Sequence, residues 1–149
     1  MSLFRDFSKE ESTAVLRAVK EKLGTSYTVT HLGHAAMVLA MLKFNPPPDN
    51  VLEGQSFISP CFMNGRRYLR ADPSMTHDYI PVCQAFGAVV FPNVKDYIIS
   101  SDATNERSAE TLIKATKAAR TSYQSIREQD SILSESLPIP EYLAGDVFK

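Results

Sequence analysis

Several residue types and features that mark particular protein classes are scarce or missing. The 149 residues contain no tryptophan, and two cysteines are too few for a disulfide framework. Sixteen lysines and arginines face seventeen aspartates and glutamates, so the net charge of −1 lacks the basic footprint of a nucleic-acid binder or a polybasic membrane-surface protein. No apolar run approaches the ~18 residues of a membrane-spanning helix, and no signal peptide is visible. We therefore expect a soluble, cytoplasmic protein of one domain, residues 1–149, with no nucleic-acid or membrane partner.

Common catalytic and ligand motifs are missing as well. The sequence has no Gly-x-Ser-x-Gly, no Gly-x-x-x-x-Gly-Lys-Ser/Thr and no Gly-x-Gly-x-x-Gly. His31 and His34 are three residues apart, a spacing that suits a metal, but no Glu or Cys stands at ligand spacing beside them. We predict structural or interface roles for both and no metal. Cys61 and Cys83 lie in apolar, strand-like runs, which predicts buried, inert thiols and no nucleophile.

Two helices are predicted in the first third of the chain. Ser8 and Glu11 have the spacing of a capping box, and Gly24 supplies a stop for the helix that follows. Residues 29–42 are apolar around most of a helical cylinder, so we expect this second helix to be buried and not amphipathic. The prolines at 46–48 end it.

Strands and one long helix are predicted in the remainder. Residues 56–63 resemble a strand that leads into the turn-like pair Asn64-Gly65. Apolar runs within 79–94 and at 97–99 resemble further strands, and a long helix begins within 101–105 and runs to about Asp130. The order of elements predicts an α/β (α+β) two-layer sandwich, with a mixed sheet covered by helices. The stripe expected to face the core on the long helix is Leu112, Ala115, Ala119, Tyr123 and Ile126.

Arg66 is the side chain that we single out. It follows the Asn64-Gly65 turn at the start of a strand-like run, and a guanidinium held there can bind a carboxylate through two hydrogen bonds. An exposed arginine on a solvated turn explains the same residues equally well. The residues alone leave both interpretations open.

A wider pattern surrounds this turn. Thr28-Val29-Thr30-His31 leads into the helix that carries Ala35-Ala36, an apolar strand and Asn64-Gly65-Arg66 follow, and 85–90 reads Ala-Phe-Gly-Ala-Val-Val. This order resembles the C-terminal half of the chloramphenicol-acetyltransferase-like superfamily, which includes BAHD acyltransferases and condensation domains. The chain looks most like the fungal branch typified by trichothecene 15-O-acetyltransferase. The resemblance covers most of the chain, from about residue 7 to residue 126.

The resemblance implies a fold and an activity. It implies half of a chloramphenicol-acetyltransferase-like fold, acetyl-CoA or a related acyl-CoA as co-substrate, and acetyl transfer to a small-molecule alcohol in secondary metabolism. Enzymes of the superfamily carry His-x-x-x-Asp-Gly, whose histidine is the general base. This sequence lacks that motif, so we expect no catalytic residue in the chain and a catalytic N-terminal half supplied by another segment or chain.

The resemblance also implies residue roles. Arg66 stands where the family has an arginine that pairs with the aspartate of the catalytic motif. Thr28, Thr30, His31 and Asn64 are expected to line the substrate channel, although helix capping explains the first three equally well. Two alternatives stay open: a non-catalytic binding or assembly module of the same fold that self-associates as a homodimer, and a metal-binding protein that uses His31 and His34.

Overall fold

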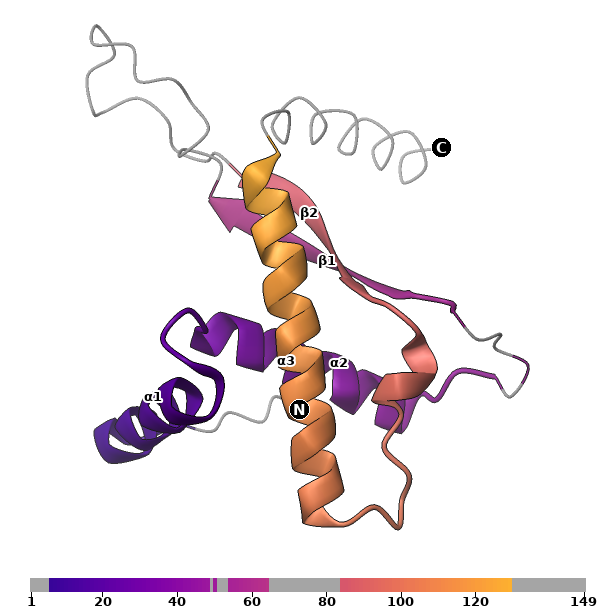
Figure 1. The fold of residues 1–149 in the computed structure, drawn as a ribbon, viewed down its shortest axis with the longest axis horizontal. Helices are drawn as coiled ribbons and strands as arrows, with labels where there is room; N and C mark the ends of the chain where they lie inside the picture. Colours follow the sequence, from indigo (N-terminus) through magenta and orange to yellow (C-terminus); the bar gives the residue numbers. More distant parts are fainter. Residues whose placement is uncertain (1–5, 49, 51–53, 65–83, 130–149) are drawn as a thin grey trace, which may run out of the picture. The chain divides into compact units, whose positions relative to one another are not determined.

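The computed structural model describes residues 6–48, 50, 54–64 and 84–129. Its element order is α1 (Lys9–Leu23), α2 (Val29–Phe44), β1 (Phe57–Asn64), β2 (Gln84–Phe91), the short 3-10 helix η2 (Val94–Tyr97) and α3 (Asn105–Glu128) (Figure 1). In this part of the chain β1 and β2 pair as a two-stranded antiparallel sheet. The predicted α/β class is confirmed.

The chain divides into two compact units. The first comprises Met1–Phe57 with Phe91–Thr121, and the second comprises Ile58–Val90 with Ser122–Lys149. Helices α1 and α2, η2 and most of α3 thus belong to the first unit. The paired stretches of β1 and β2 and the last turns of α3 belong to the second.

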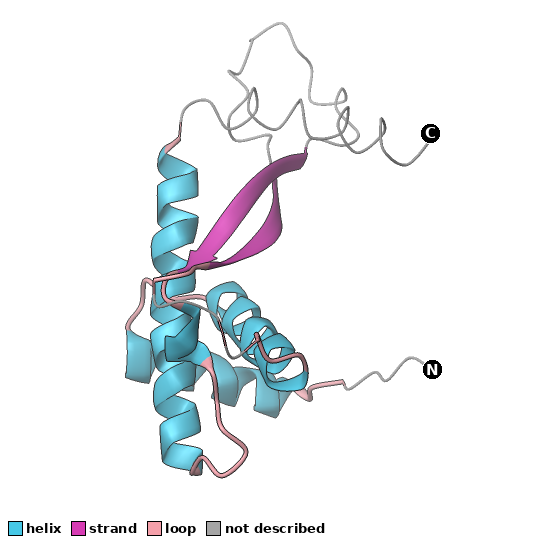
Figure 2. Cartoon of the chain, turned by 90° about the vertical axis from the view of Figure 1, so that its right-hand side faces the viewer, coloured by secondary structure: helices cyan, strands magenta, loops and turns pink. Residues whose placement is uncertain are grey.

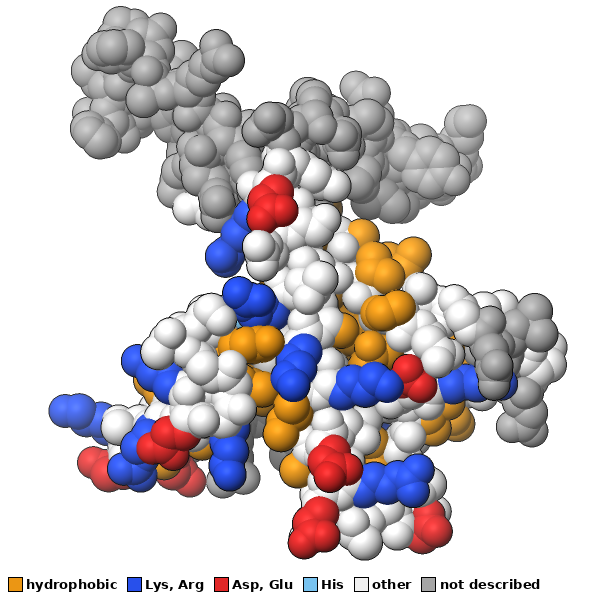
Figure 3. Space-filling model, in the orientation of Figure 1, with side chains coloured by type: hydrophobic (Ala, Val, Ile, Leu, Met, Phe, Trp, Pro, Cys, Tyr) orange, Lys and Arg blue, Asp and Glu red, His pale blue; other side chains and the backbone are white. Residues whose placement is uncertain are grey.

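Helix α1 begins and ends where the sequence predicts. The Ser8 hydroxyl accepts a hydrogen bond from the Glu11 N–H at 3.1 Å, and the Glu11 carboxylate accepts one from the Ser8 N–H at 2.9 Å. This reciprocal box satisfies two N–H groups that the first helical turn leaves without a partner. Gly24 follows the last turn with a φ of 101°, a conformation that favours glycine. Lysines, arginines and acidic residues intermingle over the surface of α1 (Figure 3).

Helix α2 buries one side only, so the prediction of a wholly buried helix is wrong. The buried side consists of His31, His34, Ala35, Val38, Leu39 and Leu42. The opposite side is also apolar, but it is exposed. We name it the outer face of α2, and its members are Val29, Gly33, Ala36, Met37, Ala40, Met41 and Phe44.

Aromatic side chains form the centre of the first unit. The Phe91 ring is fully buried and meets the rings of Tyr97, His34 and Phe57 at centroid distances of 5.6, 6.0 and 6.5 Å. Tyr97 reaches this cluster from η2, and Ile98 and Ile99 after it are not in a strand. The predicted strand at 97–99 is therefore wrong, because Tyr97 is the last residue of a helical turn that buries its ring.

In the second unit the strands form a twisted ribbon (Figure 2). A Cβ built on Gly87 of β2 would lie only 3.0 Å from Ile126 Cδ1 of α3 and 3.2 Å from Cys61 Sγ of β1. The absence of a side chain at Gly87 thus lets the end of α3 pack closely on the ribbon. The Ser122 hydroxyl accepts a hydrogen bond from the Val90 N–H and donates one to the Val90 carbonyl, both at 3.0 Å.

Most of the predicted core stripe on α3 is buried. Ala115, Ala119, Tyr123 and Ile126 are buried, and Leu112 is half-buried. The first two belong to the first unit and the last two to the second. The helical periodicity thus identified the buried face of α3 over residues 115–126.

Candidate functional site

The first turn of α2 holds three of the four residues predicted to line a channel. Thr28 is the N-cap residue, in extended backbone conformation, and His31 stands three residues later. The His31 Nδ1 accepts a hydrogen bond from the Thr28 backbone N–H at 3.1 Å and lies 3.3 Å from the Thr28 hydroxyl. His31 thus does what glutamate or glutamine does in the usual capping box.

This hydrogen bond assigns a role to one ring nitrogen of His31. A backbone N–H can only donate, so Nδ1 is the acceptor in this contact. The geometry therefore argues for a capping role for His31 and against a role of Nδ1 as general base.

His31 contacts an aromatic side chain, which in turn contacts a cationic one. The Tyr27 ring meets the His31 ring edge-on at a centroid distance of 6.2 Å. The Arg120 guanidinium of α3 lies 5.1 Å from the centre of the Tyr27 ring. Such a stack fixes the ring positions and adds a cation–π attraction of about 0.5–1 kcal/mol. The group Tyr27, Thr28, His31 and Arg120, here named the His31 cluster, surrounds one of the predicted site residues.

His34 differs from His31 in its surroundings. It is buried on the same helix, against the Phe91 ring. Burial lowers the pKa of His34 because it penalises the charged imidazolium. The ring is therefore neutral at pH 7. In the parts of the chain that the structure describes, no three His, Cys, Asp or Glu side chains come together in a group that could hold a metal ion.

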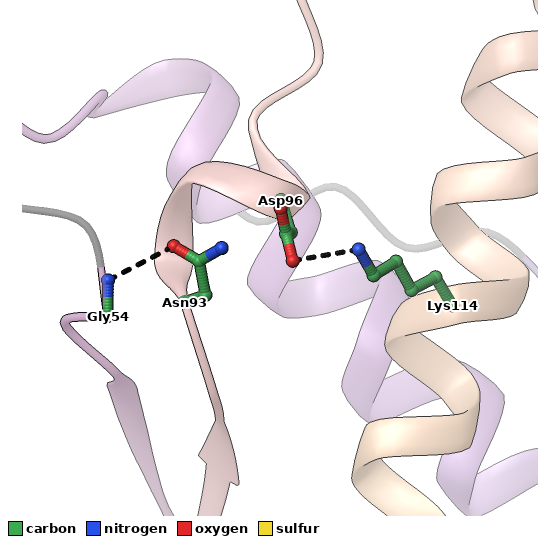
Figure 4. Close-up of polar contacts among 4 residues, drawn as sticks. All are labelled: Gly54, Asn93, Asp96 and Lys114. Atoms are coloured by element: carbon green, nitrogen blue, oxygen red, sulfur yellow. Dashed lines mark hydrogen bonds and ion pairs between the residues drawn. The ribbon is translucent and has the colours of Figure 1, made fainter.

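A second polar arrangement joins η2 to its neighbours in the first unit (Figure 4). Asn93 has a φ of 53°, in the left-handed region that asparagine tolerates, and its side-chain oxygen accepts a hydrogen bond from the Gly54 N–H at 3.3 Å. Lys114 Nζ lies 2.8 Å from Asp96 Oδ2 and 5.9 Å from the centre of the Tyr97 ring. The hydrogen bond from Lys114 lowers the pKa of Asp96. These contacts hold η2, which supplies Tyr97 to the aromatic cluster.

Cys61 is the buried thiol that the sequence predicts. It lies on β1 in contact range of Gly87, and burial raises its pKa, against smaller opposing contributions from hydrogen bonds with Tyr123 and the Gly87 backbone. Burial likewise raises the pKa of Tyr123. A thiol with a raised pKa is a poor nucleophile at neutral pH. The prediction of an inert Cys61 agrees with these surroundings, and Cys83 lies outside the described residues.

The remaining predicted site residues are only partly placed. Thr30 is exposed on α2, and Asn64 is exposed at the end of β1 in the other unit. Arg66 and Gly65 lie outside the described residues, so the roles proposed for them stay predictions. Sequence reasoning missed Tyr27 and Arg120. Tyr27 directly precedes the cap residue, but its contact with Arg120 joins positions 93 residues apart that no local pattern connects.

The backbone of this chain is similar to that of a solved acetyltransferase structure. A solved structure of the TRI3 trichothecene 15-O-acetyltransferase from Fusarium sporotrichioides superposes with a TM-score of 0.76 and 28% sequence identity. The match covers 97% of this chain and 27% of the Fusarium chain. This similarity places the chain in the chloramphenicol-acetyltransferase-like fold class that the sequence resemblance implies.

Sequence comparisons narrow the class to a family. The trichothecene 15-O-acetyltransferase TRI3 of F. sporotrichioides is 32% identical over 138 residues, which are 93% of this chain and 26% of that protein. The trichothecene O-acetyltransferase TRI3 of Trichoderma arundinaceum is 37% identical over 92 residues, 62% of this chain and 17% of that protein. The family model described as 15-O-acetyltransferase Tri3 matches residues 2–142. The chain belongs to the Tri3 family.

The chain is much shorter than these relatives. It spans about a quarter of the Fusarium protein, a smaller share than the half that the sequence resemblance implies. Among the described residues, no helix has the length and apolarity to cross a bilayer.

Proposed function

We propose that this chain is one part of a coenzyme-A-dependent O-acetyltransferase, in which it forms a wall of the substrate channel. The observation that carries the proposal is the family match over residues 2–142, together with relatives whose names describe acetyl transfer to a trichothecene. By this reasoning the donor is acetyl-CoA and the acceptor is a trichothecene hydroxyl group.

The catalytic base comes from another segment or chain. Four residues after His31, His34 and His77 stand alanine, valine and proline, so none of the three begins a His-x-x-x-Asp motif. The His31 Nδ1 atom already accepts a hydrogen bond from the Thr28 N–H, which supports a base from outside this chain's described residues. In the reaction the base takes the proton of the acceptor hydroxyl, whose oxygen attacks the thioester carbonyl. The tetrahedral intermediate then expels the coenzyme A thiolate.

In this proposal, the chain lines the substrate channel and helps to position the catalytic motif of the other segment. The contacts of the His31 cluster position Thr28 at the start of α2, and Thr30 is exposed on the same helix. We place Thr28, Thr30, His31 and Asn64 along the channel and give Arg66 the role of ion-pair partner to the aspartate of the motif. All of these roles are proposals from the resemblance.

A chimera tests the function. In it, this chain replaces the matching quarter of the Fusarium enzyme, and release of free thiol from acetyl-CoA is followed in the presence of a trichothecene alcohol. We expect acetyl transfer in the chimera and none by the 149-residue chain alone. Arg66→Ala in the chimera should reduce turnover by about 100-fold or more, as loss of a positioning ion pair does, whereas Arg66→Lys should retain part of it. A chimera that folds but does not transfer acetyl groups would refute the proposal.

A non-catalytic assembly module is the second candidate. The missing base motif and the exposed apolar outer face of α2 both favour it. Native mass spectrometry of the purified chain distinguishes the two. A stable homodimer of 16.6 kDa subunits supports the module, and a monomer that becomes active only within the chimera supports the acetyltransferase.

A further inference from the structure

The outer face of α2 is a continuous apolar surface on the helix. Its members recur at positions 29, 33, 36, 37, 40, 41 and 44, the three- and four-residue spacing that aligns side chains along one side of a helix. Met37, Met41 and Phe44 are 47%, 50% and 86% exposed. Thr30 is the polar residue that shares this side of the helix.

The composition of α2 does not suit contact with water. Its 16 residues include a single lysine and no acidic residue, and Lys43 lies at the rim of the outer face. Helix α1, which exposes most of its surface, has a charged residue at nearly every second position: Lys9, Glu10, Glu11, Arg17, Lys20, Glu21 and Lys22. Exposed apolar patches of this kind mark interaction sites.

Gly33 gives a second, independent indication. Glycine is the least favourable helix residue after proline, and it stands in the interior of α2. A Cβ built on Gly33 meets nothing within 4 Å, and the backbone there has no positive φ. The described part of the chain therefore gives no reason for glycine at this position. With Ala36 and Ala40, it forms a row of small residues on the outer face, over which the backbone of a partner can approach α2 closely.

We propose that the outer face of α2 docks on the remaining three quarters of a Tri3-type acetyltransferase. The inference rests on the proposed function. The superposition that covers 97% of this chain covers only 27% of the Fusarium enzyme, so most of that larger fold is available to cover this face. A second copy of the chain is the rival occupant.

The test compares the isolated chain with the chimera defined above. Met37→Glu on the outer face has a matched control in Leu16→Glu on α1, because both side chains are 47% exposed. In the isolated chain, we expect both substitutions to leave the melting temperature nearly unchanged. In the chimera, Met37→Glu should lower the melting temperature by several degrees, since it buries an unpaired charge, and Leu16→Glu should not.

Gly33→Ala should change the melting temperature in opposite directions in the isolated chain and in the chimera. In the isolated chain it should raise the melting temperature by a few degrees, because alanine favours the helix and meets open space. In the chimera the same methyl group should lower it, because it enters a close contact. Circular dichroism and calorimetry measure both.

Four outcomes overturn the inference. Equal melting temperatures for chimeras with and without Met37→Glu mean that the rest of the enzyme does not cover this face. A strong loss of stability in the isolated chain means that the chain covers the face itself. A wild-type homodimer that Met37→Glu dissociates assigns the face to a second copy, and a chimera without a cooperative transition shows that the larger fold does not accept the chain. A stable, inactive chimera that responds to Met37→Glu retains the inference and refutes the acetyltransferase function.

Discussion

Replacing Gly87 by alanine is the most direct test of how helix α3 packs on the β-ribbon. The new Cβ would lie 3.0 and 3.1 Å from two Ile126 side-chain carbons and 3.2 Å from Cys61 Sγ. These separations are shorter than carbon–carbon contacts of about 3.5–4.0 Å. Ile126 is 5% exposed and Cys61 6%, so both side chains are held within the packed interior and not at the surface.

The magnitude follows from two opposing effects. Insertion of a methyl group into a packed site costs roughly 2 kcal/mol, in the middle of the range for overpacking. Replacement of glycine by alanine within a strand returns about 0.5–1 kcal/mol of backbone entropy. We therefore expect Gly87→Ala to lower the free energy of unfolding by about 1 kcal/mol, which shifts the melting temperature by about 4 °C.

Urea denaturation, followed by circular dichroism, measures this change. The double variant Gly87→Ala with Ile126→Val removes the Cδ1 atom nearest the new methyl group. It should therefore be destabilised less than the sum of its two single variants. Gly33→Ala is the control, since its Cβ meets nothing and the variant should gain stability. A Gly87→Ala protein as stable as the wild type, or additive behaviour of the pair, would show that α3 and the ribbon do not meet as described.

Three further predictions concern single hydrogen-bonding or titrating groups. Ser122→Ala should cost about 1–2 kcal/mol of unfolding free energy, because it removes two hydrogen bonds to the Val90 backbone, while Thr121→Ala, which loses one bond to its own helix, should cost clearly less in the same urea titration. His34→Gln should make stability depend less on pH. Since burial lowers the folded-state pKa of His34, the wild type loses stability as the pH falls below the unfolded-state value of about 6.5. In thermal melts between pH 7 and pH 5, the melting temperature of the variant should fall less than that of the wild type. Asp96→Asn should destabilise the protein at pH 7 and make no difference once the pH lies below the lowered pKa of Asp96, because the ion pair with Lys114 contributes only while the carboxylate is charged; an equal effect at all pH values would contradict this account.

Local signals in the sequence predict the helices well. The capping box at Ser8 and the glycine at position 24 give α1 its two ends, because both act through contacts within a single turn. The apolar period along 112–126 identifies which side chains of α3 share one face, because helical geometry fixes that spacing. The partners that bury this face, such as Gly87 for Ile126, come from elsewhere in the chain.

The failures share a physical cause, which is dependence on distant partners. The apolar pattern of α2 does not reveal whether its outer face contacts this chain, a partner or water. The prediction of full burial assumed the first of these and is wrong. Residues 97–99 have the composition of a strand, but the ion pair of Asp96 with Lys114 and the burial of the Tyr97 ring stabilise a helical turn instead. Propensity is a weak guide where such tertiary contacts decide.

The candidate site shows the same division. Thr28 and His31 lie together as a helix start predicts, because three residues separate them. The Arg120–Tyr27 stack could not be predicted, since it requires knowledge of how α3 crosses the start of α2. The Asn64 and Arg66 roles depend on partners beyond the described residues and stay predictions.

The hydrogen bonds between Ser122 and Val90 have a consequence for synthesis on the ribosome. The two residues are 32 positions apart, and Ser122 follows Val90 in the chain. Strand β2 therefore leaves the exit tunnel well before the hydroxyl group that occupies its edge. During that interval the Val90 N–H and carbonyl can pair with another nascent strand, and the exposure ends only when the last turns of α3 have formed. A ribosome that pauses between these two codons would prolong the period in which the new chain is open to aggregation.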